Sequence, residues 1–308
     1  ISQQHAVTTL IQELTQPEQP PLKGIIHAAG VLDDSLLSNL SWQQFEKVLA
    51  PKVQGTWHLH QQTQSLSLDF FICFSSIASL IGSPGQANYA AANAFMDTLM
   101  QHRRTNGLPG RSINWGPWTN AGMAANLDNN TQARMQARGI NPITSEQGLK
   151  ILEDLLTASI TQPIPDSAAQ VGAFSIEWNK FISQLPPGVS LPALKQFEEQ
   201  FKSDDSSKGD RLQGLKQLKQ IPTAARRHHL MRHIQTEIAD VLGYTDPEEI
   251  ALDQPLGDLG VDSLMAVELA NQLEYNLGPT IPASFLFEHP TLEGLVNYLV
   301  EAIPEVDF

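Results

Sequence analysis

The first 180 residues alternate between short apolar runs and stretches with helical spacing. Four apolar runs predict strands, at residues 24–29, 70–74, 112–115 and 171–174. Between them, apolar residues recur at helical spacing over about 42–61 and 88–104. Strands that alternate with helices are typical of a parallel sheet with crossover helices. The pattern therefore predicts an α/β domain at residues 1–185.

The pattern changes over residues 186–220, which we interpret as a linker. This region opens with Pro-Pro-Gly, and residues 202–210 are polar and turn-rich. Beyond it, four short helical patterns predict a small all-α four-helix bundle, at about 224–242, 263–277, 284–287 and 292–302. We expect this second domain at residues 221–302, followed by a tail at 303–308.

Composition and charge narrow the class of protein. The 308 residues suffice for about two domains. The net charge is −14, and residues 221–308 hold 15 acidic residues against 3 arginines. Such a surface maintains solubility, disfavours nucleic acid and favours basic partner surfaces. No apolar run approaches the roughly 18 residues of a membrane span, and the sequence has no signal peptide pattern, so we expect no membrane association.

Cysteine and histidine usage gives two weaker indications. Cys73 is the single cysteine, which excludes an internal disulfide framework and favours a cytoplasmic location. We expect it to be a small buried strand residue. Three histidines, His228, His229 and His233, gather in one helical pattern. No carboxylate or thiol completes a ligand set there, so we expect a solvated helix face and no metal.

Four side chains in the α/β domain form a set suited to carbonyl reduction. Tyr89 and Asn93 are four residues apart and share one helix face. Ser76 follows the run 70–74, at a strand end where open α/β sheets bind ligands. Lys52 lies on the preceding helix and helps to poise the phenol, whose ordinary pKa is about 10, for proton transfer. Tyr89 would protonate a carbonyl oxygen, and Ser76 would hydrogen-bond that oxygen as charge develops on it.

Each of these residues alone also has a structural interpretation, such as a core edge for Tyr89 or a solvated charge for Lys52. Their spacing and placement together favour the catalytic interpretation. With their surroundings they resemble the ketoreductase domain of modular polyketide synthases, a branch of the short-chain dehydrogenase/reductase family. The matching segments are 27–30, 74–76, 86–93 and 114–118. Many members of the wider family have lysine four residues after the tyrosine. Here Asn93 takes that place and the lysine comes earlier, an exchange typical of the polyketide synthase branch.

The resemblance implies a partial Rossmann-like sheet, NADPH as the cofactor and a β-ketoacyl thioester as the substrate. It places Pro117 beside the nicotinamide, and a strand-end segment beside the nicotinamide ribose. That segment consists of His27, Ala28, Ala29 and Gly30. The 308 residues contain no Gly-x-Gly-x-x-Gly turn for the cofactor's pyrophosphate. We therefore expect a ketoreductase domain that is truncated at its N-terminus and that, by itself, binds NADPH poorly and is inactive.

A second resemblance concerns stereochemistry. Leu32, Asp33 and Asp34 resemble the Leu-Asp-Asp signature of B-type ketoreductases. The sequence has no Trp near Ile81, and Ala91 stands where epimerising members carry proline. These features imply a D-configured β-hydroxyl product with an unchanged α-substituent. The alternative for the two aspartates is a loop or a helix cap.

Residues 259–265, Leu-Gly-Val-Asp-Ser-Leu-Met, open one of the helical patterns of the second domain. Ser263 presents a primary hydroxyl at the helix start, where the helix dipole favours a bound phosphate. An Asp-Ser pair alone would be read as a helix cap. The whole run resembles the phosphopantetheine-attachment site of acyl carrier proteins, which implies a 4′-phosphopantetheine bound covalently to Ser263.

Together these resemblances imply a polyketide synthase fragment, a ketoreductase domain followed by an acyl carrier protein domain. The implied partners are the carrier-bound β-ketoacyl substrate, a phosphopantetheinyl transferase, and the ketosynthase and acyltransferase domains of a homodimeric parent synthase. Two alternatives stay open. One is a carrier beside a ketoreductase-like domain that does not reduce, which NADPH consumption would distinguish. The other is a peptidyl carrier beside an unrelated α/β domain, which the mass of the acyl group on Ser263 would distinguish.

Overall fold

The computed structural model describes residues 1–119, 135–136, 138–161, 168–183, 212–242, 244, 246–261, 263–282 and 285–308. At positions 263, 264, 268 and 287 it describes the backbone alone. The chain divides into two compact units. The first comprises Ile1–Leu127 and Ile140–Ile176, and the second comprises Asp128–Gly139 and Glu177–Phe308.

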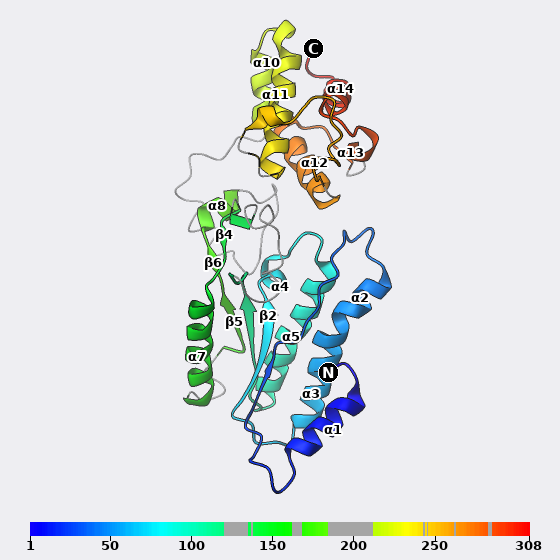
Figure 1. Ribbon diagram of the computed structural model, residues 1–308. Coiled ribbons are helices and arrows are strands. Elements are labelled where there is room, and N and C mark those ends of the chain that lie inside the picture. The colour runs from blue at the N-terminus through cyan, green and yellow to red at the C-terminus, as the bar shows by residue number, and fades with distance from the viewer. Residues whose placement is uncertain are drawn as a thin grey trace. The chain divides into compact units, whose positions relative to one another are not determined.

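A four-stranded parallel sheet forms the centre of the first unit (Figure 1). Its strands, in spatial order, are β1 (Gly24–His27), β2 (Phe70–Ser76), β3 (Arg111–Trp115) and β5 (Gln170–Ala173). Cys73 of β2 pairs with His27 on one side and Ser112 on the other. A separate antiparallel pair joins β4 (Ile140–Asn141) to β6 (Ser175–Ile176). The predicted α/β fold is confirmed, and all four predicted strands exist with ends shifted by one or two residues.

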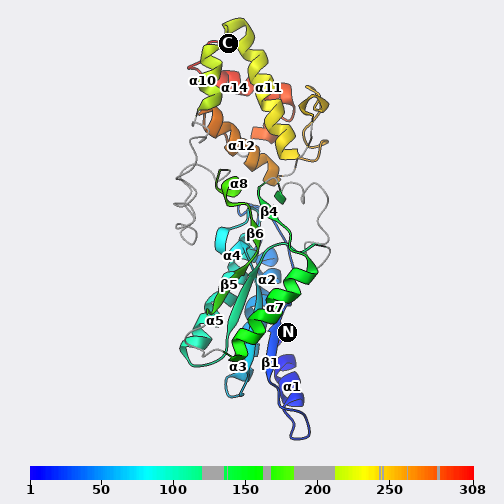
Figure 2. The same cartoon turned by 90° about the vertical axis from the view of Figure 1, so that its left-hand side faces the viewer.

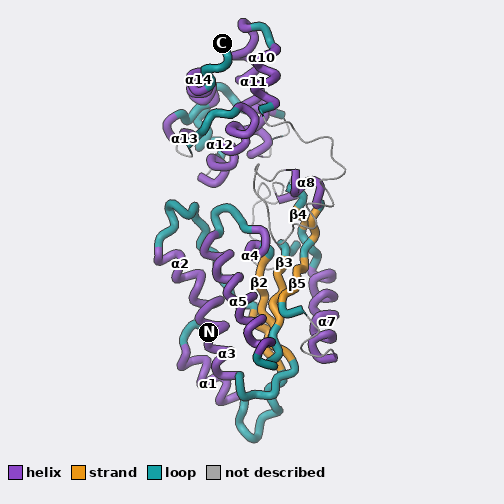
Figure 3. Tube along the Cα trace, turned by 180° about the vertical axis from the view of Figure 1, so that it is seen from behind, coloured by secondary structure: helices purple, strands orange, loops and turns teal. Residues whose placement is uncertain are grey.

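Helices cover both faces of this sheet (Figures 2 and 3). On one face lie α1 (Gln4–Leu14), α3 (Gly55–Thr63) and α5 (Ala87–Thr105), and on the other lies α7 (Ser145–Thr161). Side chains of β2 alternate between these layers. Phe71 and Cys73 join the cluster with the first group of helices, whereas Ile72 packs with Ile113 on the α7 side. The sequence pattern did not predict α1 or α7, nor the short helices α4 (Ala78–Ile81) and α8 (Trp178–Ser183).

The single helix predicted at 42–61 is wrong in one respect, because an irregular turn interrupts it. The segment consists of α2 (Trp42–Leu49), a π-helical turn at Ala50–Gln54 and then α3. Pro51 explains the interruption, because proline lacks the N–H that a regular helix donates four residues back. In the π register, the N–H of Gly55 donates to the carbonyl of Ala50, five residues earlier.

The second unit contains the predicted helical domain. Its helices are α10 (Gln213–Gln220), α11 (Thr223–Leu242), α12 (Ser263–Leu277), α13 (Phe285–Glu288) and α14 (Leu292–Ala302), with a 3-10 turn at Pro247–Glu249. They enclose one apolar core, in which Leu230, Leu269 and Leu295 are fully buried. The helices α11 to α14 correspond to the four predicted helical patterns.

Two features differ from the predicted boundaries of this domain. The helix α10 lies within the predicted linker, and its Leu215 and Leu218 are buried in the same core. In the predicted tail, Ile303 and Val306 are buried there as well. The leucines of α10 stand among lysines and glutamines, a composition typical of linkers, which masks their helical spacing. In the part of the chain that is described, no helix combines the length and the apolar character needed to cross a bilayer.

Candidate functional site

Two of the predicted catalytic residues meet at the carboxyl end of β2. Ser76 is the last residue of this strand, and Tyr89 lies in the first turn of α5. The Oγ of Ser76 accepts a hydrogen bond from the backbone N–H of Ala78 at 3.2 Å. The hydroxyl proton of Ser76 thus stays available for another acceptor.

Tyr89 is a buried phenol with an exposed fraction of 7%. Its backbone N–H donates to Oδ1 of Asn88 at 2.8 Å, which fixes the start of α5. Burial raises the pKa of the Tyr89 hydroxyl, and hydrogen bonding with Ser76 and Asn93 opposes that rise in pKa. The phenol is therefore protonated at neutral pH and can act as a proton donor.

Lys52 projects from the π-helical turn into the same region. Only 2% of this residue is exposed, and its Nζ donates to the carbonyl of Phe74 at 3.1 Å. The same Nζ lies 5.3 Å from the centroid of the Tyr89 ring. Burial lowers the pKa of Lys52 to about 8, and Coulombic interactions with Cys73 and Asp97 act in the opposite direction. The ammonium group thus lies within cation–π distance of the Tyr89 ring.

Asn93 lies one turn after Tyr89 and is fully buried. Its Nδ2 donates to the backbone carbonyl of Tyr89 at 2.8 Å, so it does share the predicted helix face. The backbone carbonyl of Asn93 accepts from Oγ of Ser75 at 3.5 Å. Its Oδ1 is a buried atom without a hydrogen-bond partner. The structure thus brings Asn93 next to the predicted set, and its catalytic role stays a prediction.

The predicted ribose-binding segment, residues 27–30, lies beside Lys52. His27 is buried at the end of β1, and its Nε2 lies 3.0 Å from the carbonyl oxygen of Pro51. Gly30 packs on the lysine stem, since a Cβ at this residue would lie 2.9 Å from Cε of Lys52. Ala28 and Ala29, between them, are exposed. The two ends of the segment therefore contact the lysine turn, while its middle faces solvent.

A nicotinamide cofactor fits part of this arrangement. Small exposed residues follow β1 at the sheet edge that also carries Ser76, and open α/β sheets bind ligands at this edge. Pro117, predicted to flank the nicotinamide, follows β3 at the same edge and accepts a bond from the backbone N–H of Ile143 at 2.9 Å. The donors Ser76 and Tyr89 suit a carbonyl beside the nicotinamide. The sequence offers no Gly-x-Gly-x-x-Gly turn for the pyrophosphate.

The predicted stereocontrol residues form a loop tied to its neighbours on both sides. Asp33 accepts hydrogen bonds from Lys47 at 2.8 Å and from Gln44 at 3.0 Å, and these bonds lower the pKa of its carboxyl. Asp34 accepts from Gln86 at 2.7 Å, three residues before Tyr89. Leu32 packs against the cluster that contains the tyrosine. The loop is therefore fixed to the segment that leads into the candidate site.

Sequence reasoning did not identify a buried polar network beneath Ser76. Nδ2 of Asn114 in β3 lies within hydrogen-bond distance, 2.7–3.1 Å, of four acceptors that share its two hydrogens: Oγ of Ser75, the carbonyl of Ser76, Oγ of Ser79 and Oδ2 of Asp97. Asn114 is fully buried, and Asp97 is buried on α5. The available signal was a polar residue inside a predicted buried strand, which normally requires hydrogen-bond partners.

The carrier region presents Ser263 as the first residue of α12. Gly260, three residues earlier, has a positive φ of 92°, a conformation that glycine adopts without steric cost. The predicted turn at Gly260 thus precedes the start of α12. The side chain of Ser263 and the whole of Asp262 lie outside the described residues. The described residues hold no group of three or more His, Cys, Asp or Glu arranged to bind a metal, and His233 instead lies 3.7 Å from Glu237.

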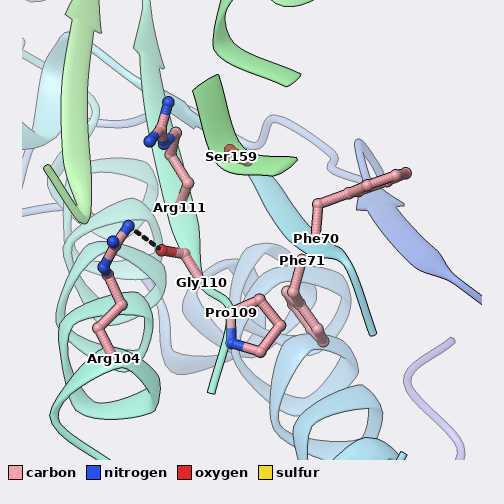
Figure 4. Close-up of a pocket in the computed structure, with 7 residues that line it drawn as sticks. All are labelled: Phe70, Phe71, Arg104, Pro109, Gly110, Arg111 and Ser159. Atoms are coloured by element: carbon pink, nitrogen blue, oxygen red, sulfur yellow. Dashed lines mark hydrogen bonds between the residues drawn. The ribbon is translucent and has the colours of Figure 1, made fainter. Parts of the chain in front are cut away.

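A small pocket lies at the amino ends of the strands, away from the carboxyl ends at which Ser76 lies (Figure 4). Phe70 and Arg111, which begin β2 and β3, form part of its lining. The guanidinium of Arg104 donates to the carbonyl of Gly110 at 3.4 Å beside it. The pocket contains none of the predicted site residues.

Comparisons with known proteins also distinguish an N-terminal region from a C-terminal one. Residues 1–120 match the KR domain family, and residues 232–299 match the phosphopantetheine attachment site family. A phenolphthiocerol synthesis polyketide synthase of Mycobacterium marinum (strain ATCC BAA-535 / M) is 36% identical over 99% of this chain and 14% of its own length. Mycoketide-CoA synthase of Mycobacterium tuberculosis (strain ATCC 25618 / H37Rv) is 35% identical over 92% of this chain and 7% of its own length.

Solved structures of ketoreductases match part of the chain. A structure of A-type ketoreductases from a modular polyketide synthase has a TM-score of 0.53 and 35% identity, over 59% of this chain and 36% of that chain. The ketoreductase from the first module of phoslactomycin biosynthesis in Streptomyces sp. HK803 has a TM-score of 0.51 and 30% identity, over 59% of this chain and 40% of that chain. The chain therefore belongs to the polyketide synthases and comprises a ketoreductase region followed by a phosphopantetheine-attachment domain.

Proposed function

We propose that this chain contributes the catalytic residues that reduce a β-ketoacyl thioester, and that it carries acyl chains on Ser263. The observation that carries the reductase proposal is the meeting of Ser76, Tyr89 and Lys52 at the end of β2. Ser76 has a proton to donate, Tyr89 is protonated at neutral pH, and Lys52 places a positive charge beside the phenol ring. This set supports carbonyl reduction better than a purely structural role.

In the proposed reaction, the keto oxygen of the substrate accepts a hydrogen bond from Ser76 and a proton from Tyr89. A nicotinamide cofactor, which we propose to be NADPH, supplies a hydride to the carbonyl carbon when bound. As the C=O electron pair moves onto oxygen, Ser76 stabilises the developing charge. Tyr89 then completes the hydroxyl by giving up its proton. The ammonium of Lys52, 5.3 Å from the ring centroid, stabilises the phenolate that remains.

The carrier proposal rests on the position of Ser263 at the start of α12. A helix N-terminus favours the phosphate of a 4′-phosphopantetheine group attached there. The thiol of that group would hold the acyl chain as a thioester. Tethering then raises the effective concentration of the keto group near Tyr89, which offsets weak affinity for a small substrate.

The reductase proposal is tested in a longer protein that joins this sequence to a nucleotide-binding half. Tyr89→Phe should lower the rate of NADPH consumption by a factor on the order of 100 to 10,000, because the proton donor alone is lost. Ser76→Ala should cost about 10- to 1000-fold, as expected for one oxyanion donor. Tyr298→Phe, in the helical domain, is the matched control and should leave turnover unchanged. Turnover near the wild-type rate in Tyr89→Phe would exclude this mechanism and favour a non-reducing domain.

The carrier proposal has its own test. Incubation of the 308-residue chain with a phosphopantetheinyl transferase and coenzyme A should add the mass of one phosphopantetheine group. Ser263→Ala should abolish the addition, and Ser284→Ala is the matched control. Modification that persists in Ser263→Ala would contradict the assignment.

Several finer points belong to the proposal. The partners would be the carrier-bound β-ketoacyl chain, the transferase, and the ketosynthase and acyltransferase domains of a homodimeric synthase. The relatives that match are polyketide synthases, which supports this setting over a non-ribosomal one. The cytoplasmic location, which the single cysteine favours, stays a prediction.

A further inference from the structure

Lys52 lies on a turn whose geometry is irregular. The turn Ala50–Gln54 is π-helical, and its second residue is Pro51. Turns of this kind depart from the regular hydrogen-bond ladder and occur frequently at functional sites. The direction in which the Lys52 side chain leaves the helix therefore depends on the contacts that hold this turn.

His27 provides such a contact from outside the helix. Its Nε2 lies 3.0 Å from the carbonyl oxygen of Pro51, the residue directly before Lys52. Because a carbonyl oxygen can only accept, Nε2 of His27 carries the proton in this bond. Burial, together with the charge of Lys52, lowers the pKa of His27 to about 4. The ring is therefore neutral at pH 7 and donates this bond without adding a second positive charge beside the lysine.

Gly30, at the other end of the segment 27–30, packs against the side chain of the same lysine. Because a Cβ at residue 30 would lie only 2.9 Å from Cε of Lys52, a side chain there would displace the lysine stem. The free end of that stem then reaches the carbonyl of Phe74 at 3.1 Å. The segment after β1 thus fixes both the turn and the path of the side chain.

We propose that His27 is a positioning residue for Lys52. Its hydrogen bond to Pro51 fixes the π-helical turn, and the turn directs the ammonium group to the Phe74 carbonyl and the Tyr89 ring. This role differs from the ribose contact predicted for His27 from the sequence. Only the expected effect of His27 on turnover rests on the proposed reduction. The placement of Lys52 can be measured without any turnover.

The surroundings of Lys52 make that measurement informative. The titratable groups that face it are His27 of β1, Cys73 of β2, and Tyr89 and Asp97 of α5. Since His27 is neutral at pH 7, replacing it with another neutral residue changes no charge around the lysine. A change in the pKa of Lys52 in such a variant would therefore report a change in its position and burial.

Two variants that differ by one methylene test the proposal. The amide of His27→Gln can take the place of Nε2 and donate to Pro51, whereas the shorter amide of His27→Asn takes the place of Nδ1 and falls short. Lysine is labelled with ¹³C at Cε in the 308-residue chain, its signals are titrated by NMR, and Lys52→Arg assigns the relevant signal. Turnover is measured in parallel in the longer protein that carries a nucleotide-binding half.

We expect Lys52 to titrate near pH 8 in the wild type and in His27→Gln. In His27→Asn its pKa should rise toward the ordinary value of about 10.4, and kcat should fall about 10- to 100-fold with little change in KM. Equal titration of Lys52 in the Asn and Gln variants would overturn the proposal, even if His27→Asn lowers the melting temperature. Failure of the proposed reduction would instead appear as absent turnover in the wild type, and the NMR titration would still decide the role of His27.

Discussion

The side-chain amide of Asn114 donates a hydrogen bond of 2.9 Å to Oδ2 of Asp97, which joins β3 to α5 beneath the candidate site. The same amide also donates to the carbonyl of Ser76, the last residue of β2. A single buried side chain thus connects three of the elements that position Ser76 and Tyr89. Because buried carboxylates and carbonyls are costly when they lack partners, this network stabilises the strand end at which the site forms.

Asn114→Ala should therefore destabilise the first unit. Asp97 would then keep Ser79 as its hydrogen-bond donor, at 2.6 Å, and lose the amide. We expect the free energy of unfolding to fall by about 2–4 kcal/mol. Four of the five tryptophans, all except Trp178, belong to the first unit, so urea unfolding followed by tryptophan fluorescence reports mainly on that unit. The exposed Asn106→Ala is the matched control, and equal midpoints for the two variants would contradict the role of the network.

A second prediction concerns the extent of the carrier domain. Leu218 of α10 is 1% exposed and packs in the core of the second unit, so Leu218→Ala should cost about 3 kcal/mol. In hydrogen exchange measured by mass spectrometry, peptides from α11 and α12 should then exchange about a hundredfold faster. Gln217→Ala, on the exposed side of the same helix, should leave exchange unchanged. If α10 belonged to a linker outside the fold, both variants would behave like the wild type.

Much of the fold follows from the sequence because its signals are local. The apolar run at residues 70–74 predicts the strand that the structure shows at Phe70–Ser76, and the limits predicted for α12, Ser263–Leu277, are those found. At the interrupted helix, Pro51 itself is a local signal for the break. The hydrogen bond between His27 and the Pro51 carbonyl joins residues 24 apart, so no local pattern could predict that contact.

The same limit applies to the candidate site. Tyr89 and Asn93 are four residues apart, and their shared helix face could be predicted directly. The contact of Gly30 with Lys52, and the bonds that Asn114 makes to Ser76 and Asp97, depend on how strands and helices pack. The sequence therefore predicted that Ser76, Tyr89 and Lys52 would lie together. The structure adds Gly30 and Asn114, which contact these residues or their neighbours.

Acid should destabilise the first unit through His27. Its pKa lies near 4 in the folded chain and near 6.5 in the unfolded chain. Between these values the unfolded state binds the extra proton, so the free energy of unfolding falls as the pH decreases from about 6.5 to 4. His27→Gln removes this group and should reduce that fall by up to about 3 kcal/mol. Urea unfolding at pH 7 and pH 4.5 provides the measurement, and the exposed His5→Gln should reproduce the wild-type pH dependence.

We expect the 308-residue chain to bind NADPH weakly. The sequence has residues suited to the nicotinamide end and no Gly-x-Gly-x-x-Gly turn for the pyrophosphate. Calorimetric titration of NADPH should therefore detect no tight binding. A dissociation constant in the micromolar range would contradict this expectation and would require a phosphate site of another kind.

The last prediction is stereochemical and rests on the loop that carries Asp34. This carboxylate accepts a hydrogen bond from Gln86 at 2.7 Å, and the backbone N–H of Ser35 donates to the carbonyl of Gly85 at 2.9 Å. These bonds fix the loop to the segment just before Tyr89. We expect the fixed loop to admit the acyl chain from one side, so that one face of the ketone would receive the hydride.

We therefore expect a D-configured β-hydroxy thioester from the longer protein that carries a nucleotide-binding half. A difference of about 3 kcal/mol between the two approaches already gives more than a hundredfold preference. Chiral chromatography of the product measures this ratio. Gln86→Ala should lower it by releasing Asp34, while the exposed Gln61→Ala should not. A predominantly L product would overturn the B-type assignment and leave the roles of Tyr89 and Ser76 intact, because both serve either face of the ketone.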